Sequence, residues 1–249
     1  MSKTYALIPA AGSGSRVRAA VPKQYLEISG RPLLYYALRP LVRHPRIEQV
    51  FVVLAQGDTN FRDYDWRDFG AKVEPLYCGG VTRTASVFNG LMAARDMIEP
   101  SDWVLVHDAA RPCLSDAALE RLLIEAGGDE TGGLLAVPVS DTLKRANCDL
   151  RAVGTEPREH LWLAQTPQMF RYRLLIDALR LADPGIATDE ARAIEGVGLK
   201  PRLVMGDTRN LKVTYPEDLG IAELILRSQG ASATMPGRRA RPKVKPRKA

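Results

Sequence analysis

Short, fully apolar runs recur along this chain, and they constrain its fold more than any other feature. Five of them predict strands, at Tyr5–Pro9, Val50–Leu54, Trp103–Val106, Leu134–Val137 and Leu203–Met205. They lack the apolar–polar alternation of a strand with one face in water, so each predicted strand must be covered on both faces. Such strands are typical of a mostly parallel sheet that lies between two layers of helices.

Helical patterns separate these runs. Two segments place apolar residues on one helical face, namely Val87, Leu91, Ala94 and Ile98 in the first and Leu119, Leu122, Leu123 and Ala126 in the second. Thr214 and Glu217 have the spacing of a capping box for a last helix that runs to about Arg227. Strands that alternate with helices predict an α/β protein with a three-layer α/β/α, Rossmann-like sheet. Ligands of such sheets bind beyond the carboxyl ends of the strands.

The rhythm breaks between about residues 138 and 161, where no long amphipathic helix can be found. An excursion of this length is unusual within a compact domain, so we expect it to have a role. The residues alone allow either a projecting arm or a plain surface insertion. We expect residues 1–230 to form one domain that includes this excursion.

The net charge of +6 belongs to the C-terminal end of the chain. Seven basic residues and no acidic ones lie in the last stretch: Arg238, Arg239, Arg241, Lys243, Lys245, Arg247 and Lys248. Without them the chain has 28 basic and 29 acidic residues, a net charge of −1. We therefore expect a nearly neutral domain followed by a disordered basic tail over 231–249.

The cysteines and the hydropathy indicate a cytoplasmic protein. Cys78, Cys113 and Cys148 lie far apart without paired Cys or His, which supports neither a zinc site nor a disulfide framework. No apolar run approaches the roughly 20 residues that span a membrane, and no signal-peptide pattern is present at the N-terminus.

A glycine-rich turn follows the first apolar run. Ala10, Ala11, Gly12 and Gly14 remove bulky side chains where the backbone N–H groups can cradle phosphate oxygens. Arg16 and Lys23 add two cations close to this turn. The spacing fits neither the dinucleotide fingerprint, which needs a third glycine where Val17 stands, nor the Walker loop.

A second candidate group lies at the end of another predicted strand. Asp108 follows Trp103–Val106 at the expected ligand edge, where an unpaired carboxylate is costly. It could ligate Mg²⁺ together with phosphate oxygens, or accept a hydrogen bond from a substrate hydroxyl. A salt bridge to Arg111, three residues further on, is the structural alternative.

Four blocks in order resemble the nucleotidylyltransferases with a glycosyltransferase-A-like αβ fold. They are the glycine turn with Pro22–Leu26, the segment Gly79–Val87, the sequence His107–Pro112 and the sequence Asn210–Thr214. With Thr166–Gln168 they resemble more narrowly the 2-C-methyl-D-erythritol 4-phosphate cytidylyltransferases of non-mevalonate isoprenoid biosynthesis. The resemblance covers about residues 3–228.

This resemblance implies that the phosphate of methylerythritol phosphate attacks the α-phosphorus of CTP and releases pyrophosphate, with Mg²⁺ as cofactor. Arg16 and Lys23 would hold the triphosphate, and Lys212 would bridge the α-phosphate and the incoming phosphate. The other nucleotide-binding residues that it implies are Ala10, Ala11, Gly12, Gly14, Gly80, Val81, Ser86 and Asp108.

The resemblance also implies a homodimer in which a β-arm over about 138–161 embraces the partner. Substrate-binding residues would be Asp108, Arg111, Thr188 and Asp189, together with Thr142 and Arg158 from the partner's arm. Two rival interpretations remain open. One is a cytidylyltransferase of the same build that acts on ribitol 5-phosphate, and the other is a nucleic-acid-binding protein that acts through its basic tail. The second is disfavoured, because the body of the chain has no nucleic-acid-binding motif. We expect no specific nucleic acid and no membrane among the partners.

Overall fold

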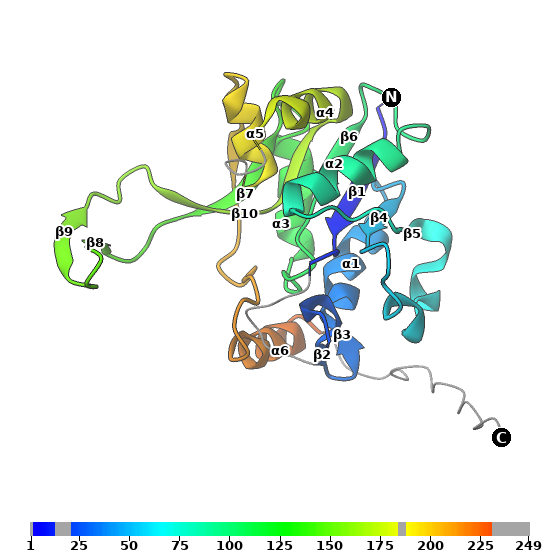
Figure 1. Ribbon diagram of the computed structural model, residues 1–249, viewed down its shortest axis with the longest axis horizontal. Helices are drawn as coiled ribbons and strands as arrows, with labels where there is room; N and C mark the ends of the chain where they lie inside the picture. The colour runs from blue at the N-terminus through cyan, green and yellow to red at the C-terminus, as the bar shows by residue number, and fades with distance from the viewer. Residues whose placement is uncertain (1, 13–20, 184–187, 231–249) are drawn as a thin grey trace, which may run out of the picture.

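The computed structural model describes residues 2–12, 21–183 and 188–230. A seven-stranded sheet with the strand order β11-β7-β10-β6-β1-β4-β5 crosses the molecule (Figure 1). Its strands are β1 (Thr4–Pro9), β4 (Val50–Val53), β5 (Val73–Leu76), β6 (Trp103–Val106), β7 (Gly133–Pro138), β10 (Trp162–Arg171) and β11 (Arg202–Met205). Strand β10 pairs antiparallel with β6 and β7, and the other neighbours pair in parallel. The mostly parallel sheet and its five expected strands are confirmed.

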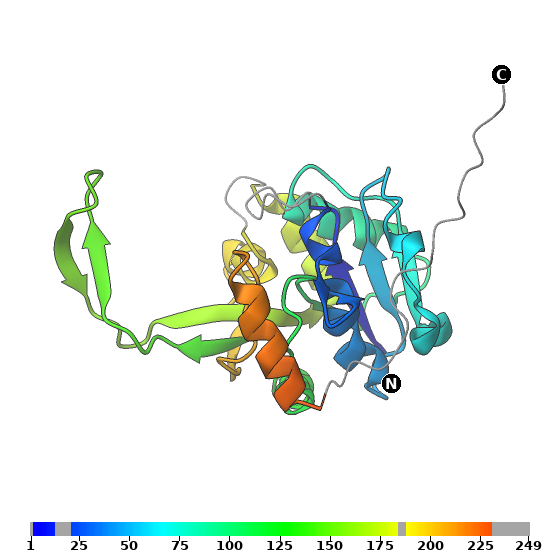
Figure 2. The same cartoon turned by 90° about the horizontal axis from the view of Figure 1, so that it is seen from below.

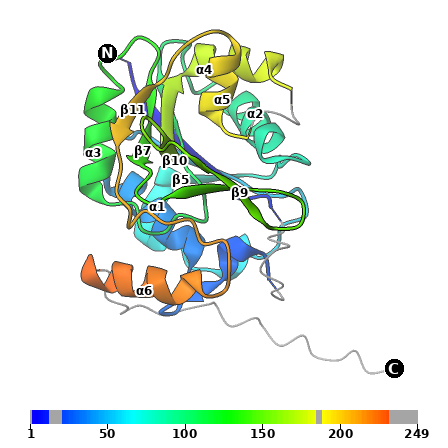
Figure 3. The ribbon, with the colours of Figure 1, turned by 90° about the vertical axis from the view of Figure 1, so that its left-hand side faces the viewer.

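Helices cover both faces of this sheet (Figure 3). Helices α1 (Leu33–Arg43) and α3 (Asp116–Glu125) pack on one face, and α2 (Arg83–Ala93), α4 (Tyr172–Leu181) and α5 (Glu190–Gly196) pack on the other. Helix α6 (Asp218–Ser228) lies outside these layers, against α1 and the small ribbon of β2 (Glu27–Ile28) and β3 (Arg31–Pro32). Short 3₁₀ turns span Lys23–Tyr25, Phe61–Asp63 and Arg67–Lys72. Within the described residues, no helix has both the length and the apolar character needed to cross a bilayer.

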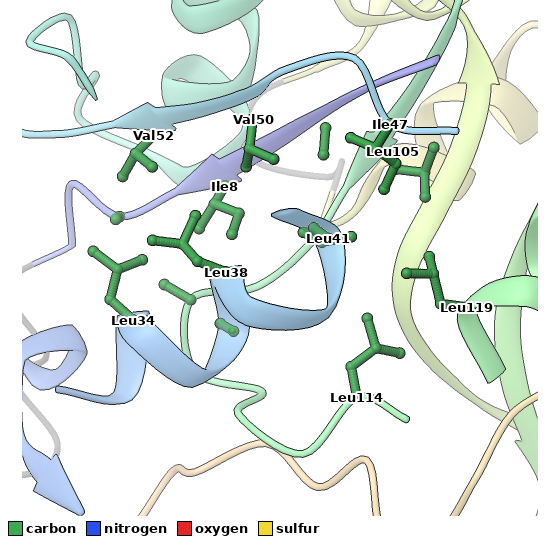
Figure 4. Packing of buried hydrophobic residues seen from close by; sticks show 14 of the residues in the cluster. Ile8, Leu34, Leu38, Leu41, Ile47, Val50, Val52, Leu105, Leu114 and Leu119 are labelled. Carbon is green, nitrogen blue, oxygen red and sulfur yellow. The ribbon is translucent and has the colours of Figure 1, made fainter. Parts of the chain in front are cut away.

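Burial on both faces explains why the runs in β1, β4, β6 and β7 are apolar throughout. The expectation of cover on both faces is wrong for β11, an edge strand in which Leu203 and Met205 are exposed. Ile8 and Val52 point toward Leu34 and Leu38 of α1 (Figure 4). The intervening residues of the same strands, such as Phe51, belong to the opposite core beneath α2 and α4. Burying one such side chain stabilises the fold by about 1.5–3 kcal/mol, so a polar residue on either face would weaken the sheet.

Two strands of the main sheet, β5 and β10, are not predicted by the apolar runs in the sequence. Strand β10 contains Gln165, Pro167 and Gln168, which read as a loop because proline cannot donate to a ladder. The pairing of β10 with β7 shifts register between Ala164 and Gln168, and this irregularity accommodates the proline. Strand β5 is an edge strand with a proline of its own, Pro75, and all its residues are only partly buried.

The excursion between residues 138 and 161 forms a projecting arm. Its two strands, β8 (Leu143–Ala146) and β9 (Ala152–Glu156), pair only with each other and stand away from the main sheet (Figures 1 and 2). A hydrogen bond from the Val139 N–H to the Leu161 carbonyl (3.0 Å) joins the segments that enter and leave the arm at its base. The prediction of a projecting β-arm is thus confirmed, and a plain surface insertion is excluded.

The last helix is where the sequence predicts it, but its cap is different. The Asp218 carboxylate accepts hydrogen bonds from the N–H groups of Thr214 (2.7 Å) and Tyr215 (2.9 Å). The Thr214 hydroxyl donates to the Lys212 carbonyl instead of capping the helix, and Glu217 makes no side-chain cap. The expected capping box is therefore wrong, because Asp218 already holds the N–H groups in front of the helix.

Candidate active site

An open pocket of about 510 Å³ lies at the carboxyl edge of the sheet. It is bounded by the ends of β1 and β6 and by the loop after β5, where ligands of such sheets are expected. The lining residues are Pro9, Ala10, Ala11, Gly12, Lys23, Gln24, Gly80, Val81, Thr82, Arg83, Ser86, Asp108, Ala109, Ala110, Lys212 and Thr214. Segments that lie up to two hundred residues apart in the sequence therefore meet at one site.

The 3₁₀ turn Lys23–Tyr25 holds the turn after β1 in place through a side-chain hydrogen bond. The Gln24 side-chain amide donates to the Ala10 carbonyl (2.7 Å), and Gln24 is buried. Lys23 Nζ donates to the Val213 carbonyl (2.9 Å), which links this turn to the segment that carries Lys212. Both lysines thus border the same pocket.

The loop after β5 approaches the first turn very closely. A Cβ atom on Gly79 would collide with the Ala11 side chain and lie 2.9 Å from the Leu54 carbonyl oxygen. The Ser86 hydroxyl, on α2, accepts from the Gly80 N–H (3.1 Å) and donates to the Thr82 carbonyl (2.9 Å). Glycine is therefore required at position 79 for the two loops to form one wall of the pocket.

Asp108 lies between two cations at the centre of the site. Its Oδ1 accepts from Arg83 Nε (2.9 Å), and its Oδ2 lies 2.6 Å from Lys212 Nζ. Burial alone would raise the pKa of Asp108, but the two cations hold this pKa far below its usual value. Arg111 donates instead to the carbonyls of Asn210 (2.6 Å) and Ala164 (3.3 Å). The cationic partners of Asp108 are thus Arg83 and Lys212, and the alternative of a salt bridge to Arg111 is not observed.

A chain of hydrogen bonds fixes the backbone beneath Asp108. The Asp108 N–H donates to the Thr166 hydroxyl (3.0 Å), which lies 2.9 Å from His107 Nδ1. His107 Nε2 lies 3.1 Å from the Arg111 carbonyl, so the proton sits on Nε2 and the Thr166 hydroxyl donates to Nδ1. Burial lowers the pKa of His107 to about 4. His107 is therefore a neutral structural residue.

The donor set in this pocket does not fit a metal ion held by the protein. Asp108 is the sole carboxylate among the described lining residues, and each of its oxygens already pairs with a cation. Across the residues that the structure describes, no group of three His, Cys, Asp or Glu side chains is arranged to bind a metal. Direct Mg²⁺ ligation by Asp108 would have to compete with the contacts that its oxygens make to Lys212 and Arg83.

The predicted site residues divide into three groups. Those that line the pocket are Ala10, Ala11, Gly12, Lys23, Gly80, Val81, Ser86, Asp108 and Lys212. Gly14 and Arg16 lie outside the described residues. Those absent from the described pocket lining are Arg111, Thr142, Arg158, Thr188 and Asp189.

Within the last group, Arg111 lies in the loop after β6, and the other four residues have two locations in the fold. Thr142 and Arg158 are exposed on the arm, where the Arg158 guanidinium donates to the Ser140 carbonyl. Asp189 caps α5 by accepting from the Arg192 N–H (2.9 Å) and also accepts from Gln168 (2.9 Å). It directly precedes Glu190, which contacts the pocket residue Arg83. Thr188 and Asp189 are thus connected to the pocket wall through Glu190 and its contact with Arg83.

Sequence reasoning missed three features of the pocket. Arg83 lies in the segment Gly79–Val87, where an arginine that follows two glycines before a helix is a usable signal. Gln24 lies next to Lys23 in the segment Pro22–Leu26, which is likewise a usable signal. Glu190 carries no sequence signal, because only the fold brings α5 against the start of α2.

Comparison with known proteins agrees with this geometry. A sequence model described as 2-C-methyl-D-erythritol 4-phosphate cytidylyltransferase matches residues 4–228. The chain belongs to this family. The proteins of that name from Nitrosospira multiformis and Dechloromonas aromatica are 56% and 57% identical to it, over 92% of this chain and 99% and 100% of theirs.

Solved structures of the family have the same fold. A crystal structure of 4-diphosphocytidyl-2C-methyl-D-erythritol synthase matches with a TM-score of 0.80 and 41% identity over 91% of this chain and 99% of that one. The cytidylyltransferase of Francisella tularensis matches with a TM-score of 0.76 and 33% identity over 90% and 100% of the two chains. As a member of this family the chain is a nucleotidyltransferase, which converts CTP and 2-C-methyl-D-erythritol 4-phosphate to 4-diphosphocytidyl-2-C-methyl-D-erythritol in isoprenoid biosynthesis.

Proposed function

We propose that the pocket at the carboxyl edge of the sheet carries out the cytidylyl transfer, with Lys212 as its central catalytic residue. One observation carries the proposal: Lys212 comes from a segment far along the sequence from Lys23 and the turn at Gly12, yet all three border one pocket. A cluster of cations and backbone N–H groups suits a polyanionic substrate. Arg16 belongs to the same turn in sequence and is proposed as the third cation.

The reaction needs alignment and charge neutralisation rather than a general base. The attacking phosphate monoester has a second pKa of about 6, so it is mostly ionised at neutral pH. Its oxygen attacks the α-phosphorus in line, the bond to the β-phosphate oxygen breaks, and pyrophosphate leaves with that electron pair. Lys212 would lie between the attacking phosphate and the α-phosphate, and Lys23 and Arg16 would neutralise the departing pyrophosphate.

The two facing loops are proposed to select cytosine. Ala10, Ala11 and Gly12 offer backbone groups on one side, and Gly80 and Val81 offer them on the other. Two facing loops that offer backbone donors and acceptors would exclude purines by size and uracil by its mismatched edge. Ser86 acts here by holding Gly80 in place, since its hydroxyl already bonds to this loop.

We propose that Mg²⁺ enters with the phosphate oxygens of CTP as its principal ligands. Magnesium commonly keeps several waters and binds substrate phosphates with few protein ligands. As a metal ligand, Asp108 would share with the ion the oxygens that pair with Arg83 and Lys212. Asp108 is better suited to hold Lys212 before CTP binds and to accept a hydroxyl hydrogen bond from the polyol.

We propose that two copies of the chain share their active sites through the arms. A two-stranded hairpin is marginally stable by itself. The arm exposes Leu150 and Val153 to more than half of their full area, and so does β10 at Leu163 near the base of the arm. A second copy that covers this surface would bring Thr142 and Arg158 to the polyol phosphate. Arg111 and Thr188 would complete that half of the site, and Arg111 has a buried Nε without a hydrogen-bond partner in the described residues.

The cellular location is proposed from the cysteines. Cys78, Cys113 and Cys148 are free thiols, as expected for a protein of the reducing cytoplasm. The basic tail over 231–249 lies outside the described residues, and we assign it no part in catalysis.

The decisive experiment measures pyrophosphate release by the purified protein with Mg²⁺. Each of the four nucleoside triphosphates is offered with 2-C-methyl-D-erythritol 4-phosphate or with ribitol 5-phosphate. We expect turnover with CTP and methylerythritol phosphate alone. Equal rates with ribitol 5-phosphate, or with UTP, would contradict the proposed specificity.

A further inference from the structure

Arg83 joins two buried carboxylates that come from different elements. It is the first residue of α2, and its Nη1 and Nη2 donate to Glu190 Oε1 (2.7 Å) and Oε2 (3.0 Å). Its Nε donates to Asp108 Oδ1 (2.9 Å). Glu190 opens α5 and is only 1% exposed, so its charge is tolerable only with a close cationic partner. The guanidinium is therefore held on two edges at once.

Lys212 contacts the same carboxylate in a different manner. Its Nζ pairs with the other oxygen of Asp108 (2.6 Å), and its side chain is 40% exposed. A lysine ammonium is a point charge on a flexible stem, whereas an arginine guanidinium binds in a fixed planar geometry. Asp108 thus has one fixed cation, Arg83, and one cation that is able to move, Lys212.

This asymmetry matters when CTP arrives. In the proposed function Lys212 moves from Asp108 to phosphate oxygens, so Asp108 loses one of its two cations. Arg83 also lines the pocket, and guanidinium groups bind phosphate strongly in a bidentate manner. Without an opposing anion, the triphosphate would draw Arg83 away as well, and Asp108 would be left buried and unpaired.

We propose that Glu190 and Arg83 are positioning residues for cytidylyl transfer. Glu190 keeps the Arg83 guanidinium on Asp108, so that Asp108 stays in place while Lys212 exchanges this carboxylate for phosphate. The inference rests on the proposed role of Lys212 and adds two residues that the sequence patterns did not assign.

The start of α5 is built to keep Glu190 in position. Asp189 caps the helix, and the Gln168 side chain holds the same turn from both sides. Gln168 Nε2 donates to Asp189 (2.9 Å), and Gln168 Oε1 accepts from the Ala191 N–H (2.7 Å). The carboxylate also lies at the positive end of the helix dipole. Thr188 and Asp189 directly precede Glu190. The contact between Glu190 and Arg83 therefore links the proposed polyol half of the site to its nucleotide half.

The test replaces Glu190 by glutamine, which keeps the shape and removes the charge. For Glu190→Gln we expect kcat to fall about 10- to 100-fold, the range that displacement of a reacting group by about an ångström can cause. We expect KM for CTP to stay equal or decrease, because the released Arg83 gains contact with the triphosphate. Glu195→Gln is the matched control, since Glu195 lies on the same helix and forms only an exposed pair with Arg192.

A second variant keeps the test valid if Glu190→Gln does not fold. Arg83→Lys preserves the charge but cannot span both carboxylates, so it should show the same fall in kcat. Thermal unfolding of each variant separates loss of fold from loss of positioning. A structure with CTP bound should retain the contact of Arg83 with Asp108 while Lys212 has moved.

Two kinetic results would overturn the inference: a wild-type kcat in Glu190→Gln despite a lower Tm, or a KM for CTP that rises in step with the fall in kcat. A structure of the wild-type enzyme with CTP in which Arg83 binds phosphate would overturn it as well. Turnover of the unmodified enzyme with methylerythritol phosphate is the separate test of the proposed function. Failure of one is therefore distinguishable from failure of the other.

Discussion

Lys212 is the residue on which the proposed chemistry depends most directly. Replacing it by alanine removes the ammonium group that would neutralise charge between the two phosphates. We expect Lys212→Ala to lower kcat/KM for CTP at least about 100-fold, the usual cost of losing a preorganised electrostatic stabiliser. Lys200→Ala is the control, because Lys200 is exposed and distant from the pocket lining. Steady-state rates within a few fold of each other in the two variants would refute the role.

His107 gives the protein a specific dependence of stability on pH. Its pKa is about 4 in the fold and about 6.5 when unfolded, so the unfolded chain binds the proton first as the pH falls. The stability from His107 is therefore complete above pH 6.5 and is lost progressively down to pH 4. The loss amounts to about 3 kcal/mol, at about 1.4 kcal/mol for each pH unit.

Urea unfolding of the wild type and of His107→Gln between pH 7 and pH 4 measures this effect. The variant should be less stable at pH 7, because it loses the bond with Thr166, but its stability should change less over this range. The difference between the two curves isolates His107 from the other titrating groups. Parallel curves would show that His107 does not titrate as described.

At the scale of elements, the two loops that face each other across the pocket depend on glycine in different ways. A methyl group on Gly79 would meet the Ala11 side chain, whereas one on Gly12 would have no atom within 4 Å. Gly79→Ala should therefore lower both Tm and CTP affinity, and Gly12→Ala should lower only CTP affinity, by filling space meant for the nucleotide. Gly220→Ala on α6 is the control, with no nearby atom and no place in the pocket. An unchanged Tm for Gly79→Ala would contradict the close approach of the loops.

The elements also show how far the sequence leads. Fully apolar runs identify β1, β4, β6 and β7, because burial on both faces removes polar residues from them. The apolar run also identifies β11, although this edge strand leaves Leu203 and Met205 exposed. The sequence does not reveal β10, because Pro167 and the nearby Gln165 and Gln168 are untypical of a central strand. The fold accommodates them through a shift in register. The motifs place Lys23, Asp108 and Lys212 in one site, whereas the contact of Glu190 with Arg83 needs the packing of α5 on α2. Contacts that arise only from tertiary packing leave no local pattern to recognise.

At the scale of the whole molecule, the arm and the pocket raise a single question. The arm carries Thr142 and Arg158 away from the main sheet (Figure 2), and neither residue is among those that line the described pocket. In the proposed dimer, these residues bind substrate in another copy of the chain. A shared site makes activity a property of two chains and can be tested without a structure of the dimer.

The test mixes two inactive proteins, Lys212→Ala and Arg158→Ala, under conditions that allow subunit exchange. Each heterodimer would contain one intact site, with Lys212 from one chain and Arg158 from the other. In an equal mixture half of the dimers are mixed, so about a quarter of the wild-type activity should return. Mixing Lys212→Ala with Lys23→Ala is the control, because both changes lie in the same half of the site and no intact site can form. If native mass spectrometry shows exchange but the first mixture stays as inactive as the control, each chain must complete its own site and the arm has another purpose.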